Sequence, residues 1–289
     1  MVLLIKEIIV LNKLLFPVKN SMHKIFSVLL VLMITQFSYG QSDKKIFKGM
    51  YIQWGYNREW YTKSNIHIKL SNGSDFILHN VTASDKPNFE SIFEYPGDIS
   101  IPQYNYRIGF YLNKNKTKAV ELNFDHAKYV VDDYQKVRVT GTIEGNSVDE
   151  EIIIDPVNNL HLEHTDGANW VHINYVQQKT IVSKQSNKRP IINLIGKIGA
   201  GINIPRTDFT WRNDRFNNDF HIAGYNISIE GGARYYFAKR WFLEATAKTG
   251  YVRYVNALAN TTQLKNNRVR HDFEYFEVIG LIGFDIPFK

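Results

Sequence analysis

Four residues combine the side-chain types that are best suited to acid–base chemistry. Asp125 and His126 are adjacent, and His164 and Asp166 are separated by one residue. A histidine beside a carboxylate can take a proton from water or from a hydroxyl group, which then attacks an acyl or peptide bond. Asp125, His126, His164 and Asp166 are therefore the candidate catalytic residues.

A structural role is the alternative for the same four residues. Neighbouring residues on a β-strand point to opposite faces, so Asp125 and His126 need not cooperate. The sequence also contains no nucleophile elbow and no His–Ser pair that would complete a hydrolase site. Polar side chains at strand ends are the first expectation, with catalysis as the alternative.

A metal site is not expected. His126, His164 and His172 lack the i, i+2 or i, i+4 spacing with which a short segment supplies zinc ligands. Cysteine is absent, which excludes disulfides, thiolate ligands and cysteine nucleophiles. The acidic run at 149–151 is expected to be a solvated loop. We therefore predict no cofactor.

The clearest structural signal is an alternation between residues 222 and 255. Alternate residues from Ala223 to Phe237 are apolar, aromatic or small, and the pattern resumes at Trp241 after a three-residue turn. A period of two predicts a β-hairpin. Pairing Phe237 with Trp241 places opposite charges across from each other, namely Arg234 with Glu244 and Glu230 with Lys248.

Similar alternation recurs along most of the chain and predicts an all-β fold. One face of these strands is apolar, and the other carries polar or charged side chains. A turn centred on Lys114 would place Arg107 opposite Glu121. We expect ten strands, or eight if residues 64–83 form an outer hairpin: 48–57, 64–70, 75–83, 102–112, 118–130, 168–180, 190–205, 221–237, 241–255 and 273–287.

The connections between these strands alternate between short and long. The short ones are at 71–74, 113–116, 183–189 and 238–240, and the long ones are at 84–101, 131–166, 206–219 and 256–272. Transmembrane β-barrels have short turns at one end and longer loops at the other. The charged face would then line a narrow interior, where charges must be paired, so we expect a plugged barrel and not an open pore.

The amino-terminal part resembles an export signal. Residues 22–40 have a short basic start, a thirteen-residue apolar run and small residues before Gln41, which predicts a signal peptide cleaved after Gly40. Residues 1–21 are interpreted as an upstream extension, and 41–289 as the barrel domain. The formal charge of +7 has no accompanying basic run, so no nucleic-acid partner is expected.

Together these features resemble the small outer-membrane β-barrel proteins of Gram-negative bacteria. The resemblance rests on the export signal, the alternating strands over 48–288 and the ending Phe284-x-Ile286-x-Phe288, after which Lys289 departs by one residue from the family pattern. It implies an antiparallel up-and-down transmembrane barrel in the outer membrane. The implied partners are outer-membrane lipids, lipopolysaccharide and the barrel assembly machinery, which reads the last strand.

The same resemblance implies two alternative functions. The first is a structural, adhesive or interaction role through the long outer loops. The second is a lipid hydrolase or acyltransferase that acts on lipid A or phospholipid at the rim of the barrel, where some small barrels are enzymes. Because fold alone does not determine function, the position of the four candidate residues has to separate the two.

Overall fold

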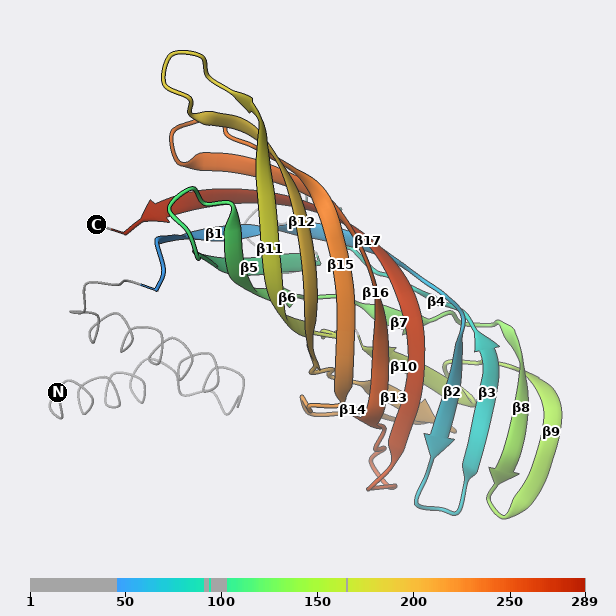
Figure 1. The fold of residues 1–289 in the computed structure, drawn as a ribbon. Helices are drawn as coiled ribbons and strands as arrows, with labels where there is room; N and C mark the ends of the chain where they lie inside the picture. The colour runs from blue at the N-terminus through green and yellow to red at the C-terminus, as the bar shows by residue number, and fades with distance from the viewer. Residues whose placement is uncertain (1–45, 91–93, 95–102, 165, 289) are drawn as a thin grey trace, which may run out of the picture. The chain divides into compact units, whose positions relative to one another are not determined.

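The computed structural model describes residues 46–90, 94, 103–164 and 166–288 (Figure 1). Within these ranges the regular structure consists of seventeen β-strands, β1 to β17. The expected upstream extension at 1–21 and the expected signal peptide at 22–40 lie outside the described residues. No helix in the described part of the chain is long and apolar enough to cross a membrane.

Eight strands close into a barrel. They follow the order β1, β5, β6, β11, β12, β15, β16, β17, and β17 returns to pair with β1. The closing register runs without a break from Gly49 opposite Pro287 to Tyr61 opposite Tyr275. The predicted antiparallel up-and-down barrel is confirmed. Its strands are β1 (Gly49–Tyr61), β5 (Tyr104–Tyr111), β6 (Lys118–Asp125), β11 (Trp170–Ser183), β12 (Pro190–Asn203), β15 (Gly224–Tyr235), β16 (Trp241–Leu258) and β17 (Arg268–Pro287).

The expectation of ten strands is wrong, and the alternative of eight is correct. Residues 64–83 form the hairpin of β2 (Ser64–Lys69) and β3 (Asp75–Val81). β1 has 13 residues, about 43 Å of extended chain, so it crosses the wall before the chain turns. β2 then pairs with Arg268–Arg270 at the outer end of β17. Alternation could not separate the two counts, because a strand facing a protein core has the same period as one facing lipid.

The connections at the outer end fold into a cap, defined as their strands together with the outer ends of β16 and β17. One sheet of the cap continues the barrel wall from β17 into β2, β3, β8 and β9, and the other has the order β14, β13, β10, β7, β4 (Figure 1). The segments 131–166 and 206–219 were expected as loops, with short strands only at 137–143 and 152–154, but they contain β8, β9, β10, β13 and β14. With β4 and β7, the cap has seven short strands besides the hairpin of β2 and β3. These are β4 (Ala83–Ser84), β7 (Tyr129–Val131), β8 (Lys136–Ile143), β9 (Asn146–Ile153), β10 (Leu160–His164), β13 (Asp208–Trp211) and β14 (Asp214–Asn217).

A buried apolar core explains why the cap is ordered. Ile68 and Leu78 from one sheet and Leu162 and Phe209 from the other are fully or almost fully buried in one cluster. The same cluster extends to the mouth of the barrel, where Trp170 is buried. Burial of apolar surface is the main stabilising contribution in a folded domain, so these connections form a second folded layer instead of mobile loops.

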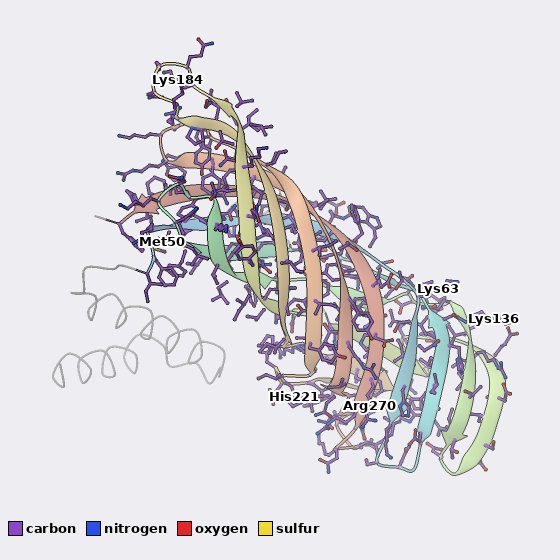
Figure 2. All side chains as sticks on the ribbon, in the orientation of Figure 1. Met50, Lys63, Lys136, Lys184, His221 and Arg270 are labelled. Carbon is purple, nitrogen blue, oxygen red and sulfur yellow. The ribbon has the colours of Figure 1, made fainter. Side chains whose placement is uncertain are left out.

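The other end of the barrel carries only short turns. Residues 112–117, 184–189 and 236–240 join consecutive barrel strands there. Lys184 lies at this end in Figure 2, whereas Lys136 and Arg270 lie at the end that bears the cap. The predicted separation of short and long connections is therefore present.

The outer wall of the barrel is apolar. Aromatic pairs stand near both of its ends, Trp241 with Phe284 near the turns and Trp60 with Phe276 near the cap. Between them, isoleucines on adjacent strands each expose more than half of their side chain: Ile173, Ile198, Ile227 and Ile229. An apolar band with aromatic girdles is the exterior of a membrane-spanning barrel.

Candidate functional site

Asp125, the first of the four candidate catalytic residues, lies inside the barrel. Its carboxylate is fully buried at the end of β6 and forms an ion pair with Lys248. The side-chain amide of Asn123 donates a hydrogen bond to it at 3.0 Å, and that of Asn105 donates another. His172 Nε2 is 3.6 Å away. Because the carboxylate is already bound by these partners, we assign Asp125 a structural role in a buried ion pair.

His126 follows β6 and points away from Asp125. Its ring stacks on Tyr104 with a centroid separation of 4.5 Å. Nδ1 donates to the side-chain oxygen of Asn169 at 3.0 Å, while the Asn169 amide nitrogen donates to the Ile204 carbonyl. Burial lowers the pKa of His126 to about 4, so the ring is neutral near pH 7. Through Asn169, the ring links the connection that follows β6 to the connection that follows β12.

His164 lies in the core of the cap. It is the last residue of β10 and is fully buried. Its Nδ1 contacts Thr207 Oγ1 at 3.1 Å, and its Nε2 contacts His271 Nε2 at 3.2 Å. Burial lowers the pKa of His164 to about 3. The ring is therefore a neutral core residue that is sealed from solvent.

Asp166 lies on the surface of the cap. Its carboxylate accepts hydrogen bonds from Arg206 Nη1 at 2.7 Å and from the Asn217 amide at 3.0 Å. No hydrogen bond or ion pair joins any two of Asp125, His126, His164 and Asp166. Arranged in this way, the four residues cannot share a proton or position a common nucleophile. Among the described residues, no group of three or more His, Asp or Glu side chains has the geometry of a metal site.

The three charge pairs expected in the barrel interior differ in outcome. Arg234 Nη2 lies 2.7 Å from Glu244 Oε2, across the hairpin of β15 and β16. Glu230 and Lys248 are also opposite each other in that hairpin, but their side chains pair with other strands. Because the barrel is narrow, long side chains reach its far wall.

Glu230 and Lys248 each contact one residue across the barrel and one on the adjacent strand other than their shared hairpin. Glu230 Oε1 contacts Arg107 Nη1 at 2.6 Å and Lys197 Nζ at 3.3 Å. Lys248 Nζ pairs with Asp125 and lies 3.2 Å from Glu277. The expected Glu230–Lys248 ion pair is thus replaced by contacts from both residues to other strands.

Arg107 and Glu121 are close, but not through the expected register. Arg107 is opposite Asn123, because the turn between β5 and β6 is centred one residue later than Lys114. The side chains nevertheless approach to 3.9 Å inside the barrel. The shorter contact of Arg107 is with Glu230, and Glu121 also accepts from Lys197 at 3.2 Å.

Side chains fill the barrel from end to end. Near the turns, the Arg234 guanidinium lies between the rings of Tyr51 and Phe242, 4.5 and 4.0 Å from their centroids. The buried ion pairs occupy the middle. At the outer mouth, Trp170 donates to the Tyr254 hydroxyl at 3.1 Å, within the buried apolar cluster. The interior therefore serves as a packed scaffold.

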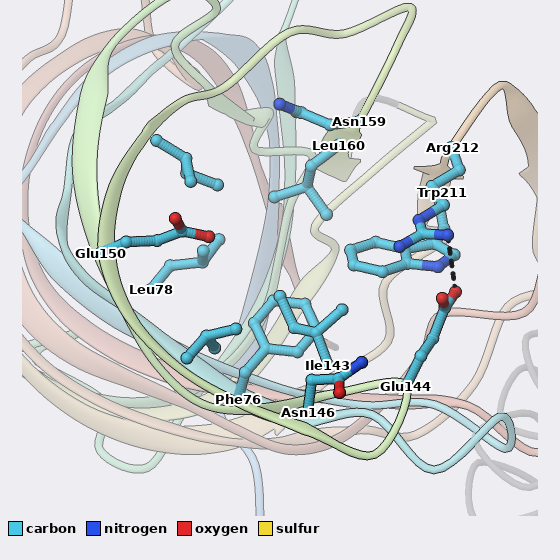
Figure 3. Close-up of a pocket in the computed structure, with 12 residues that line it drawn as sticks. Phe76, Leu78, Ile143, Glu144, Asn146, Glu150, Asn159, Leu160, Trp211 and Arg212 are labelled. Carbon is cyan, nitrogen blue, oxygen red and sulfur yellow. Dashed lines mark ion pairs between the residues drawn. The ribbon is translucent and has the colours of Figure 1, made fainter.

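A cleft of about 320 Å³ opens between the two sheets of the cap (Figure 3). This volume is at the lower end of the range for ligand pockets. Most of its lining is apolar, and none of the described lining residues is Ser, Thr, His or Lys. Its lining residues are Phe76, Leu78, Ile143, Glu144, Asn146, Val148, Glu150, Ile152, Asn159, Leu160, Trp211 and Arg212. Such a lining suits the binding of an apolar group.

Two tight turns form one end of the cleft. Glu144 and Gly145 join β8 to β9, and Arg212 and Asn213 join β13 to β14, with positive φ at all four positions. That conformation is typical of two-residue hairpin turns. An ion pair between Glu144 Oε1 and Arg212 Nη1, 2.9 Å apart, links the turns (Figure 3). The two sheets are held together at this point.

Aromatic packing forms the floor of the cleft. The rings of Phe76 and Trp211 are 5.3 Å apart, and both side chains are buried. At the other end, the Asn159 amide donates to the carbonyl of Ile153 at 2.8 Å. This bond fixes the end of β9 against the start of β10, so the shape of the cleft is set by ordered strands.

Sequence reasoning did not identify these cleft residues. Trp211 and Leu160 lie in segments that were expected to be loops. A signal was nevertheless present, because Leu160 alternates with Leu162 and Phe209 alternates with Trp211. Alternation over four or five residues is short, but it appears in two of the long connections and would have indicated strands there.

Comparisons with known proteins give only weak similarities. No family model matches the chain, and no curated protein matches its sequence. Among solved structures, Neisserial surface protein A is similar at 9% identity over 83% of this chain and 97% of that chain, with a TM-score of 0.36. The outer membrane protein OprG from Pseudomonas aeruginosa is similar at 12% identity over 84% of this chain and 98% of that chain, with a TM-score of 0.40. Ail, the attachment invasion locus protein of Yersinia pestis, is similar at 9% identity over 81% of this chain and 99% of that chain, with a TM-score of 0.30.

The assignment of the chain rests on its own strand register and surface. Eight strands close without an edge, and every charge pair of the barrel described above lies inside the wall. The exposed isoleucines face outward in a band between two aromatic girdles. An apolar exterior around a charged interior is stable only where lipid replaces water, so the wall has the surface of a membrane-spanning β-barrel.

Proposed function

We propose that the protein is an interaction barrel that binds a ligand outside the cell through its cap. The observation that carries this proposal is the apolar cleft between the two cap sheets, lined by Leu160 and Trp211. A scaffold that only crosses the membrane has no need of a second folded layer with its own core and a recess. The barrel interior is filled by side chains, which supports ligand binding at the cap over passage of a solute through the barrel.

The surroundings of the barrel belong to the same proposal. Outer-membrane lipids and lipopolysaccharide would contact the apolar band, in which Ile198 exposes 61% of its side chain. The barrel assembly machinery would read the end of β17, where Phe284 and Ile286 precede Phe288. The scattered positions of His126 and His164 give no support to a lipid hydrolase or acyltransferase.

The test uses the full chain reconstituted in lipid nanodiscs and a random peptide library displayed on phage. Because the chain has no cysteine, single cysteines can carry a bulky polar maleimide label. Asn146 lines the cleft, whereas its neighbour Ser147 does not. We expect enriched peptides whose binding falls at least tenfold with the label on Asn146→Cys.

The matched control is the same label on Ser147→Cys, which should leave binding within a factor of about two. Two results would overturn the proposed function. One is enrichment no greater than on empty nanodiscs. The other is a set of peptides whose binding responds equally to the labels at the two positions.

A further inference from the structure

Strand β9 forms a free edge of the cap. The sheet that continues the barrel wall ends at β9, which pairs only with β8 among the described strands. An edge strand presents a row of backbone N–H and C=O groups that can pair with another chain. At eight residues, β9 is long enough to offer several such bonds to an added strand.

The inward side chains of β9 form one wall of the cleft. Val148, Glu150 and Ile152 line it, and Glu150 lies between the two apolar residues along the strand. The outward neighbours are already paired. Asp149 contacts Arg138 Nε at 2.8 Å, and Glu151 contacts Lys136 Nζ at 2.5 Å. The two faces of β9 therefore differ. The charges on the outward face are paired within the protein, and the inward face is open to a ligand.

Glu150 is the unmatched member of this wall. The structure gives its carboxylate no hydrogen bond or ion pair with any other described residue, although Asp149 and Glu151 on either side each have a cation. The carboxylate points into the cleft between apolar groups in Figure 3. A positively charged ligand group beside it would gain an ion pair that the protein itself does not supply.

We propose that β9 binds an extended segment of a partner protein, which adds to the sheet as a further strand. Alternate side chains of that segment enter the cleft. The segment carries apolar residues next to Val148 and Ile152, and a lysine or arginine next to Glu150. This inference rests on the proposed function and names the ligand of the same cleft.

A second copy of the chain is a poorer occupant of the same edge. Antiparallel pairing of two β9 strands would bring the acidic run at 149–151 of one copy against that of the other. Like charges directly opposite each other destabilise a strand pair. The charge of the edge thus selects a basic segment and disfavours self-association.

The probe is a fluorescent seven-residue peptide in which threonine alternates with isoleucine, lysine and isoleucine, titrated against the full chain in nanodiscs. We expect Glu150→Gln to weaken binding about two- to fivefold, the range for one partly exposed ion pair, and Glu150→Lys to weaken it more than tenfold. Glu151→Gln is the matched control because its side chain faces away from the cleft, and it should leave the Kd unchanged.

Hydrogen–deuterium exchange supplies the second readout. Amides at 146–153 should exchange more slowly when the probe is bound, because an added strand protects the edge. A probe with glutamate in place of lysine should bind more weakly than the lysine probe. Binding without protection of β9, equal effects of Glu150→Gln and Glu151→Gln, or a β9-mediated dimer would each overturn the inference. Library peptides that depend on Asn146 but lack a basic residue would overturn it while leaving the proposed function intact.

Discussion

The Nε2 atoms of His164 on β10 and His271 at the outer end of β17 lie 3.2 Å apart inside the cap. At this separation one ring donates its proton to the other, so the pair is uncharged and shares a single bridging hydrogen. Both histidine rings are buried. The centroid of the Tyr254 ring lies 4.7 Å from that of His164 and 4.8 Å from that of His271. The pair joins the two sheets of the cap without exposing a polar group.

The first prediction is that acid loosens the cap. Burial lowers the pKa of His164 to about 3, whereas an unfolded histidine has a pKa of about 6.5. The unfolded segment therefore binds the proton first as the pH falls. The stability of the cap is therefore retained above pH ~6.5, the pKa of an unfolded histidine, and falls progressively as the pH drops below it. Hydrogen exchange of β10, measured at pH 7, 5 and 4, checks this.

The variant His164→Gln should show a shallower pH dependence of exchange in β10, since one of the titrating groups is removed. His79→Gln is the control, because His79 bonds Thr140 on the outward face of the cap at 2.7 Å. An exchange rate in β10 that does not change between pH 7 and pH 4, after correction for intrinsic exchange, would refute the prediction.

The second prediction concerns the buried ion pairs of the barrel. Arg234→Met leaves Glu244 without its closest partner, and breaking a buried pair costs about 3–5 kcal/mol. Lys197 remains 2.9 Å from Glu244, so the lower end of that range is expected. Urea unfolding of the refolded chain in detergent, followed by tryptophan fluorescence, measures the loss.

A more exposed pair provides the control. Lys116 contacts Asp285 at 2.7 Å and exposes 32% of its side chain, so Lys116→Met should cost less than about 1 kcal/mol. The double variant Arg234→Met/Glu244→Leu should lose less than the sum of the two single variants. Strict additivity would show that the two side chains do not act as a pair.

The third prediction separates the cap from the barrel. Trp211 is 8% exposed and packs on Phe76, and truncation of a buried tryptophan costs about 3–5 kcal/mol. Trp211→Ala should therefore make the cap sensitive to protease, with cuts in the segments around β9 and β13. The barrel should keep its heat-sensitive mobility on gels, because the aromatic partner of Trp211 is Phe76 within the cap.

A surface tryptophan serves as the comparison for that experiment. Trp241 exposes 45% of its side chain on the barrel wall, so Trp241→Ala should leave the cap resistant to protease. If Trp211→Ala unfolds the barrel as well, the two layers form one cooperative unit and the prediction is wrong.

Much of the barrel could be predicted from the sequence, because each wall strand has one face toward lipid and one toward a charged interior. This alternation gave the hairpin register of Arg234 with Glu244 and of Glu230 with Lys248. It could not give Arg107 as the partner of Glu230 or Asp125 as the partner of Lys248, because these partners lie across the barrel on β5 and β6. Spacing along the chain contains no information about how far a side chain reaches through a narrow interior.

The cap and its cleft were not predictable in the same way. Strands such as β10 and β13 have five and four residues, too few for a period to stand out from chance. Their pairing depends on the core that they form together, since β10 meets β13 from another connection. The site is thus made by tertiary contacts, whereas the wall is made by a local pattern.

The fourth prediction tests which surface meets lipid. Ile198 on β12 is 61% exposed and Ile153 on β9 is 56% exposed. The exposed fraction alone therefore does not show which of the two residues faces lipid. Ile198→Arg places a charge in the apolar band and should lower the free energy of unfolding in liposomes by about 2–4 kcal/mol. Ile153→Arg places the same charge on the cap, in water, and should change it by less than about 0.5 kcal/mol. Equal effects of the two substitutions would contradict the placement of the membrane around the barrel wall.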